Sequence, residues 1–136
     1  MTPSTVSLRY VILYVKDVAA TLNFYKEAFG LSKRFFNDDN GMAYGELETG
    51  AARLAFASLK LANLHLQQEI VAASPNDPPL GFEIALTTTD VAAIYAQAVK
   101  AGATVVSEPS VKPWGQTVAY LRDKDGHIVE LCTPLP

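Results

Sequence analysis

The chain has 136 residues, 49% of them hydrophobic and 18% charged, which is enough apolar material for one domain to fold without disulfides or a structural metal. The formal net charge is −3 and the eleven lysines and arginines are scattered along the chain, so nothing in their pattern would attract a nucleic acid. No apolar run approaches the roughly 20 residues that a membrane-spanning helix needs, and we expect a soluble protein with no membrane partner.

The cysteine content and the N-terminal sequence predict the compartment. The single cysteine, Cys132, cannot form an internal disulfide. The N-terminus lacks the charged segment, apolar stretch and small-residue cleavage site of a secretory signal. Both features favour a reduced, cytoplasmic protein.

The elements in the first part of the chain recur in the last part. Residues 10–30 read YVILYVKDVAATLNFYKEAFG and residues 83–102 read EIALTTTDVAAIYAQAVKAG, so the segment DVAA occurs twice. In each copy a strand-like run leads into an aspartate suited to cap a helix. Apolar residues at spacings of three and four then predict the helix, which a glycine ends. The residues that bound the two helices are Asp17, Gly30, Asp90 and Gly102.

Three short strands are predicted after each helix. They cover residues 32–38, 42–48 and 52–58 in the first copy and 104–110, 116–122 and 127–133 in the second, separated by turn signals such as NDDNG and DKDG. The prediction is therefore an α+β fold in a single domain, residues 1–136, with tandem βαβββ modules at 8–58 and 81–134. The connector, 59–80, ends in PNDPP, and its length predicts either a short helix or an edge over a site.

Three segments resemble motifs of a known superfamily. They are DVAATLNFYKEAFG at residues 17–30, KPWGQ at 112–116 and RDKDGHIVEL at 122–131. Together with the tandem βαβββ pattern, they are similar to the vicinal oxygen chelate superfamily, which contains glyoxalase I, bleomycin resistance proteins and extradiol dioxygenases. The resemblance implies a cup-shaped, curved mixed sheet with helices outside, closed around a small ligand. It also implies a homodimer.

The resemblance further implies four inward positions, on the first and last strand of each module, which hold a divalent metal in the metalloenzymes. The repeat places these positions at Tyr10, Ala55, Glu83 and Glu130. This set departs from the usual His, Gln and Glu ligands, because Ala55 has no donor and a phenol helps only when deprotonated. We expect either no cofactor or a divalent metal at Glu83 and Glu130. His65 could complete such a site, whereas alternation turns His127 to the face opposite Glu130.

Strand alternation assigns the side chains that line the inward faces. In the first module they are Tyr10, Ile12, Tyr14, Arg53, Ala55 and Ala57, and in the second Glu83, Ala85, Thr87, Ile128, Glu130 and Cys132. Glu83 and Glu130 could form a structural ion pair with Arg53. Alternatively, if they lie close together, they could share a proton and act as a general base or a hydrogen-bond donor. Cys132 is expected to be a small buried side chain, since no histidine is spaced to activate it.

The remaining candidates are expected to contact a ligand. Tyr10 and Tyr14 could stack on it, and Arg53 could clamp an anionic group. Trp114 could form a stacking wall at the rim of the cup, beside Gln116. Each has a structural alternative, which is plain packing for the tyrosines and closure of the sheet end for Trp114.

Two functions fit these residues. The first is a binding protein that holds a small, partly aromatic molecule in the cup between the modules, which would explain the missing donor at Ala55 and the aromatic wall. The alternative is a divalent-metal-dependent lyase, isomerase or dioxygenase, of the glyoxalase or extradiol type, using Glu83 and Glu130 as catalytic groups and ligands. Two inward carboxylates favour that alternative.

Overall fold

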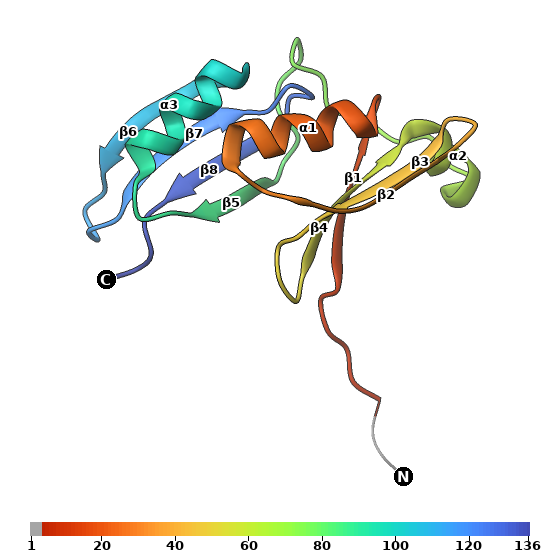
Figure 1. The fold of residues 1–136 in the computed structure, drawn as a ribbon, viewed down its shortest axis with the longest axis horizontal. Coiled ribbons are helices and arrows are strands. Elements are labelled where there is room, and N and C mark those ends of the chain that lie inside the picture. Colours follow the sequence, from red (N-terminus) through yellow and green to blue (C-terminus); the bar gives the residue numbers. More distant parts are fainter. Residues whose placement is uncertain (1–3) are drawn as a thin grey trace. The chain divides into compact units, whose positions relative to one another are not determined.

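The computed structural model describes residues 4–136, and the chain divides into two compact units (Figure 1). The first unit contains the residues up to Leu22 and residues 31–69, and the second contains residues 23–30 and 70–136. Residues 1–3, which the sequence analysis includes in the single domain and in the N-terminus without a secretory signal, lie outside the described residues. Each unit is described below by itself.

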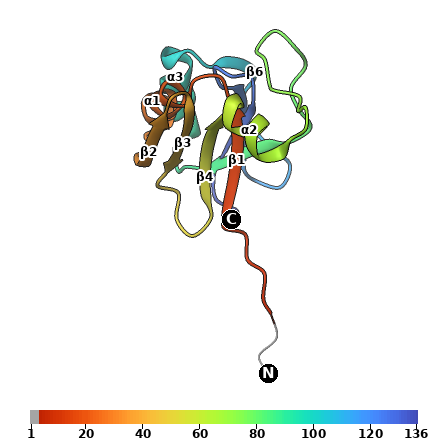
Figure 2. The same ribbon diagram turned by 90° about the vertical axis from the view of Figure 1, so that its right-hand side faces the viewer.

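The first module is a four-stranded mixed sheet. Its elements are β1 (Tyr10–Val15), α1 (Val18–Phe29), β2 (Lys33–Asp39), β3 (Met42–Leu47) and β4 (Arg53–Ser58). The strand order is β1-β4-β3-β2, with β1 parallel to β4 and the other pairs antiparallel. A short helix, α2 (Leu59–Leu66), follows in the connector and contacts β1, β3 and β4 (Figure 2). Of the two predictions for the connector, the short helix is thus confirmed.

The second module repeats this plan. Its elements are β5 (Glu83–Thr87), α3 (Val91–Ala101), β6 (Thr104–Val111), β7 (Thr117–Arg122) and β8 (Ile128–Cys132). The strand order is β5-β8-β7-β6, again with one parallel pair, β5 with β8. Helix α3 packs on β6, β7 and β8. The predicted α+β fold of two tandem βαβββ modules is therefore confirmed.

The helix boundaries follow the predicted local signals. Asp17 Oδ1 accepts a hydrogen bond of 3.0 Å from the amide of Ala20, and Asp90 Oδ1 accepts one of 3.0 Å from Ala93. At the other ends Gly30 has φ +71° and Gly102 has φ +113°, a conformation that costs a glycine little. Both predicted caps and both predicted stops are confirmed.

The face of the first sheet that packs on helix α1 is apolar and buried. Leu13, Val15, Leu54 and Phe56 are at most 7% exposed, as alternation predicts, whereas Val11, on the same face at the start of β1, is 40% exposed and is not part of the core. Strand β3 passes close to α1 at Gly45, where a Cβ would lie 2.5 Å from Leu22 Cδ1. The missing side chain thus allows the helix to approach the sheet.

A buried polar cluster holds the turn before β8 in the second unit. Asp123 is 1% exposed, accepts backbone amides of residues 125–127 at Oδ1, and accepts the Tyr25 hydroxyl at Oδ2. His127 Nδ1 lies 3.3 Å from the same Oδ2. Burial alone would raise the pKa of Asp123, but the hydrogen bonds of His127 and Tyr25 lower it below its ordinary value. Asp123 therefore holds the His127 side chain in the turn, on the face of the sheet opposite Glu130.

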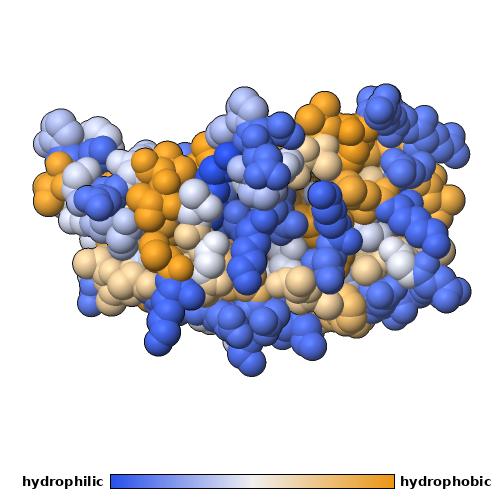
Figure 3. All heavy atoms as spheres, turned by 90° about the horizontal axis from the view of Figure 1, so that it is seen from above, coloured by the Kyte–Doolittle hydropathy of each residue, from blue (hydrophilic) through white to orange (hydrophobic). Residues whose placement is uncertain are grey.

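Hydrophilic and hydrophobic side chains are interspersed on the face seen in Figure 3, where the hydrophobic ones lie in separate patches. Scattered exposed apolar residues are normal for a folded protein and call for no special account. Among residues 4–136, no helix combines the length and the apolar character that crossing a membrane requires.

Candidate functional site

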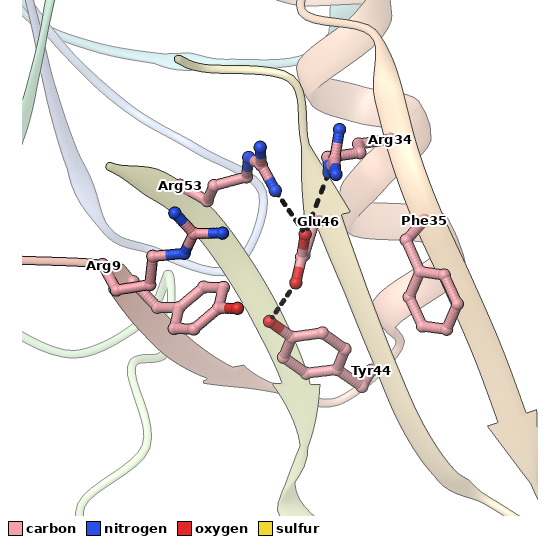
Figure 4. A pocket seen from close by; sticks show the side chains of 7 residues that line it. Arg9, Arg34, Phe35, Tyr44, Glu46 and Arg53 are labelled. Carbon is pink, nitrogen blue, oxygen red and sulfur yellow. Dashed lines mark hydrogen bonds and ion pairs between the residues drawn. The ribbon is translucent and has the colours of Figure 1, made fainter. Parts of the chain in front are cut away.

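The sheet of the first module carries a hollow of about 530 Å³. Aromatic and charged side chains line it, and Figure 4 draws them as sticks. The lining residues are Arg9, Tyr10, Arg34, Phe35, Tyr44, Glu46 and Arg53. All belong to the first compact unit, and they are called the arginine hollow below.

A β-bulge explains how two consecutive residues of β2 reach the arginine hollow. Lys33 pairs with Leu47 and Phe35 pairs with Glu46, so that Arg34 is an extra residue in the ladder. In a regular strand, neighbours point to opposite faces. The bulge breaks this alternation and re-aims side chains, so Arg34 and Phe35 both line the hollow.

Glu46 is the charged centre of the arginine hollow. Its Oε1 lies 3.6 Å from Arg34 Nε and 3.5 Å from Arg53 Nη1, while its Oε2 accepts a 2.7 Å hydrogen bond from the Tyr44 hydroxyl (Figure 4). Burial raises the pKa of Tyr44 well above its ordinary value, and Glu46 raises it further, so the phenol stays a donor to Glu46 at neutral pH. With three guanidinium groups and one carboxylate in its lining, the hollow favours an anion.

A second cluster, here named the acidic cluster, lies on the sheet of the second module and consists of Glu83, Tyr120, Glu130 and Cys132. Glu130 pairs across the ladder with Ala85 on one side and Tyr120 on the other. Partial burial of its carboxyl, and next the neighbouring Glu130 carboxylate, raise the pKa of Glu83. Burial, followed by Glu130, likewise raises the pKa of the Tyr120 phenol and of the Cys132 thiol. The cluster thus disfavours the charged form of Glu83.

The registers of the two sheets confirm the equivalences inferred from the repeat. Ile12 pairs with Ala55 and Ala85 pairs with Glu130, which makes Tyr10 the counterpart of Glu83 and Ala55 the counterpart of Glu130. One strand further along, Glu46 pairs with Ala55 and Tyr120 pairs with Glu130. The carboxylate of the first module is therefore on β3, whereas that of the second is on β8 with a tyrosine on β7.

The structure brings two predicted site residues, Tyr10 and Arg53, into the arginine hollow, and two others, Glu83 and Glu130, into the acidic cluster. Arg53 forms its ion pair with Glu46, a partner that the sequence analysis did not consider. Tyr14 is half-buried on β1. It follows Ile12 by two residues, so the two side chains lie on the same face of the sheet.

Trp114 and Gln116 lie in the turn before β7. Trp114 is 58% exposed, and its Nε1 donates a 2.7 Å hydrogen bond to Gln116 Oε1. Gln116 Nε2 in turn donates to the carbonyl of Thr133 at 2.6 Å. These bonds fix the indole to the end of the sheet, and a ligand contact of either residue stays a prediction.

Sequence reasoning missed five residues of the arginine hollow. They are Arg9, Arg34, Phe35, Tyr44 and Glu46. The superfamily's ligand positions lie on the first and last strands of each module, so the resemblance pointed to no residue of β2 or β3, and the bulge at Arg34 leaves no sequence signal. The alternation of Tyr44 and Glu46 along β3 was available in the sequence and could have placed both on the inward face.

Comparison with known proteins decides the family. A model of the Glyoxalase/Bleomycin resistance protein/Dioxygenase superfamily matches residues 7–131. The chain belongs to this superfamily. The resemblance found in the sequence motifs is thus confirmed, whereas a search of the curated proteins gives no match.

Several solved structures share the fold. A glyoxalase-related enzyme from Fulvimarina pelagi superposes with a TM-score of 0.80 at 22% identity, covering 94% of this chain and 88% of that one. A hypothetical protein from S. aureus gives 0.74 at 24% identity, covering 97% and 96% of the two chains. A superfamily enzyme from Burkholderia phytofirmans gives 0.72 at 20% identity, covering 94% and 98%. At these identities the similarity establishes the fold alone.

The four positions that hold a metal in the metalloenzymes of the superfamily do not form a full donor set here. Ala55 is completely buried and has no donor atom, and Tyr10 carries a phenol. Residues 4–136 contain no group of three or more His, Cys, Asp or Glu side chains placed to hold a metal. Two carboxylates, Glu83 and Glu130, are fewer protein ligands than zinc sites use.

Proposed function

We propose that the protein binds a small, partly aromatic molecule, with the arginine hollow as the principal contact surface. The single observation that supports this function is the hollow itself, whose volume of about 530 Å³ lies in the range of small-molecule sites. Its lining combines three aromatic rings with four charged side chains, so it is more polar than most such sites and suits a ligand that carries a charge.

The assembly of the protein and further ligand contacts outside the arginine hollow belong to the same proposal. The two modules act as one domain in a cytoplasmic homodimer, and the cup implied by the superfamily holds the ligand. Tyr10 and Arg53 contact it from the first module. Tyr14, Trp114 and Gln116 contribute further contacts.

The proposal is tested by thermal unfolding with a panel of planar aromatic molecules of one to three rings. A ligand at about 100 times its Kd stabilises the folded state by about 2.7 kcal/mol, which raises the midpoint by several degrees. Phe35→Ser removes a ring of the hollow that is 50% exposed, and Leu64→Ser, at a residue 55% exposed on α2, is the matched control. The proposal fails if no panel member stabilises the protein, or if Phe35→Ser and Leu64→Ser respond equally to the molecule that does.

A second candidate function is a metal-dependent lyase, isomerase or dioxygenase, and the acidic cluster favours it. A divalent cation beside Glu83 and Glu130 would offset the repulsion that helps to raise the pKa of Glu83. Without a metal, the same pair could hold and transfer a proton as a general acid or base. In this second function Glu83 and Glu130 bind the ion, and water or substrate supplies the remaining ligands.

The second candidate is tested by elemental analysis of protein purified without chelators, alongside Glu83→Gln and Glu130→Gln. Near-stoichiometric metal that disappears in both variants would establish it and direct attention to glyoxalase and dioxygenase assays. Absence of metal after incubation with Mn²⁺, Fe²⁺, Ni²⁺ and Zn²⁺ would reject it.

A further inference from the structure

Arg53 is the least satisfied polar group of the arginine hollow. Its side chain is only 14% exposed, and its Nε is buried without a hydrogen-bond partner among the described residues. A buried donor without an acceptor costs free energy, and native proteins keep few of them. An acceptor in the hollow reaches this shielded N–H only if the Arg53 side chain turns, which its loose contact with Glu46, 3.5 Å from Nη1, permits.

Glu46 satisfies the arginines only loosely. Its distances to Arg34 and Arg53 are 3.6 and 3.5 Å, beyond the ordinary hydrogen-bond range, whereas its bond from Tyr44 is 2.7 Å. Tyr44 therefore fixes the Glu46 carboxylate, and the guanidinium groups approach it without a close fit. They keep donors for a second carboxylate.

Arg9 adds a third positive charge at the rim. Among the described residues it has no carboxylate within ion-pair distance, and its guanidinium carbon lies 5.7 Å from the centre of the Tyr10 ring. Stacking on a ring holds a guanidinium in place and leaves its in-plane N–H donors open. The arrangement is typical of sites that take a planar anion.

Aromatic side chains flank these charges. The rings of Phe35 and Tyr44 lie 6.3 Å apart at an angle of 49°, and Phe35 is 50% exposed. In Figure 4 Arg34 and Arg53 point toward Glu46, with the Tyr44 ring directly below it and the Phe35 ring at the side. A flat apolar group would cover the exposed Phe35 ring.

We propose that the arginine hollow binds an aromatic carboxylic acid in its ionised form, with the carboxylate on Arg53 and Arg9 and the ring against Phe35. This inference rests on the proposed function and names its ligand class. A carboxylate is assigned in preference to a phosphate because Glu46 already lies beside Arg34 and Arg53, and its charge repels a doubly charged phosphate more strongly than a singly charged carboxylate. Glu46 repels the incoming carboxylate and so weakens its binding.

The inference is tested by titration calorimetry in a low-salt buffer without carboxylate or phosphate. The probes are 2-naphthoate, its neutral analogue 2-naphthamide, naphthyl phosphate and inorganic phosphate. Charge-assisted hydrogen bonds are stronger than neutral ones, so 2-naphthoate is expected to bind at least about tenfold more tightly than 2-naphthamide. Tighter binding of either phosphate would overturn the carboxylate assignment.

A matched pair of charge-neutralising variants tests the inference through a gain of affinity, which few substitutions in a binding site produce. Glu46→Gln removes the repelling charge while keeping an acceptor for Tyr44, and it is expected to tighten 2-naphthoate binding by about tenfold. Glu48→Gln removes an equal charge beside the same arginine, since Glu48 Oε2 lies 3.3 Å from Arg34 Nη1. Glu48 is outside the lining of the hollow, so this control is expected to change the affinity less than twofold.

Loss of an arginine is expected to weaken 2-naphthoate binding. Arg53→Gln is expected to weaken 2-naphthoate binding at least about tenfold, with 2-naphthamide unaffected. Because Arg53 is largely buried and its loss could prevent folding, Arg9→Gln at the exposed rim provides a second variant, with a loss of about threefold or more expected. Unchanged 2-naphthoate affinity in Arg9→Gln and Glu46→Gln together would overturn the inference.

Failure of the inference is distinguishable from failure of the proposed function. Equal affinity for 2-naphthoate and 2-naphthamide, with loss of both in Phe35→Ser, would leave an aromatic-binding protein and remove the anion site. If none of the four probes binds and the wider aromatic panel also has no effect, both proposals are wrong.

Discussion

Gly126→Ala tests how tightly the connector is fixed against the turn before β8. Gly126 has φ +102°, and a Cβ there would lie 2.6 Å from the carbonyl carbon of Ser74 and 2.8 Å from the nitrogen of Pro75. Arg122 joins the same two segments, because its Nε donates to the carbonyl of Gly126 and its Nη2 to that of Ser74, each at 2.9 Å. The connector backbone therefore has little freedom to move away from a new methyl group.

The expected loss of stability has two parts. A non-glycine residue in the left-handed region costs about 1 kcal/mol or more, and a steric overlap with fixed backbone adds about 1–3 kcal/mol. The total for Gly126→Ala is about 3 kcal/mol, which lowers the urea midpoint by roughly 1.5 M at the m-value usual for a chain of this size.

Gly50→Ala is the control, measured by urea unfolding followed by circular dichroism. Gly50 has φ +91°, but a Cβ there would have no atom within 4 Å, so its alanine variant should lose only the conformational part, about 1 kcal/mol. The reasoning is refuted if Gly126→Ala and Gly50→Ala lose the same free energy of unfolding, since the contact with Ser74 would then cost nothing.

Three further variants test packing and charge. Gly45→Ala places a methyl group 2.5 Å from Leu22 Cδ1, and urea unfolding should show a loss of about 1 kcal/mol; an unchanged midpoint would contradict the close approach. Tyr25→Phe removes a buried donor to Asp123 and should cost about 1–2 kcal/mol at pH 7. Because the depressed pKa of Asp123 contributes stability that is lost as pH falls through its folded value, acid unfolding of this variant should begin at a higher pH. Because Glu83 is an exposed residue and solvent screens its charge, Glu83→Gln should stabilise the protein at pH 7–8 by no more than about 0.3 kcal/mol. A raised carboxyl pKa gives stability present at low pH and lost as pH rises, so this gain should vanish below about pH 4. A gain independent of pH would exclude this origin.

Features of the fold that depend on neighbouring residues could be predicted from the sequence. Asp17 and Asp90 cap their helices, and Gly30 and Gly102 end them, because each acts on backbone groups within one turn. The repeat supplied the rest, since equivalent residues of two modules occupy equivalent places in two sheets. The registers agree with these equivalences, since Ile12 pairs with Ala55 as Ala85 pairs with Glu130.

Features that depend on distant residues could not be predicted. The bulge at Arg34 arises from the pairing of β2 with β3, which alternation along one strand does not reveal. The contact of Arg122 with Ser74 joins residues 48 positions apart, and no local pattern marks it. Alternation along β4 predicts that Arg53 faces inward, but its partner Glu46 lies on β3, and no pattern within β4 indicates which residue of a neighbouring strand will contact it.

The bulge in β2 also bears on association between molecules. Strand β2 ends the order β1-β4-β3-β2, and β6 ends the order of the second sheet, so each offers a free row of backbone groups. The extra residue Arg34 interrupts the first row, while register shifts around Ser107 and the ring of Pro109 interrupt the second. Irregular and charged edges resist edge-to-edge pairing and the growth of fibrils. Deleting Arg34 would restore a regular strand, and with it a template for aggregation, at the same time as it removes a guanidinium from the hollow.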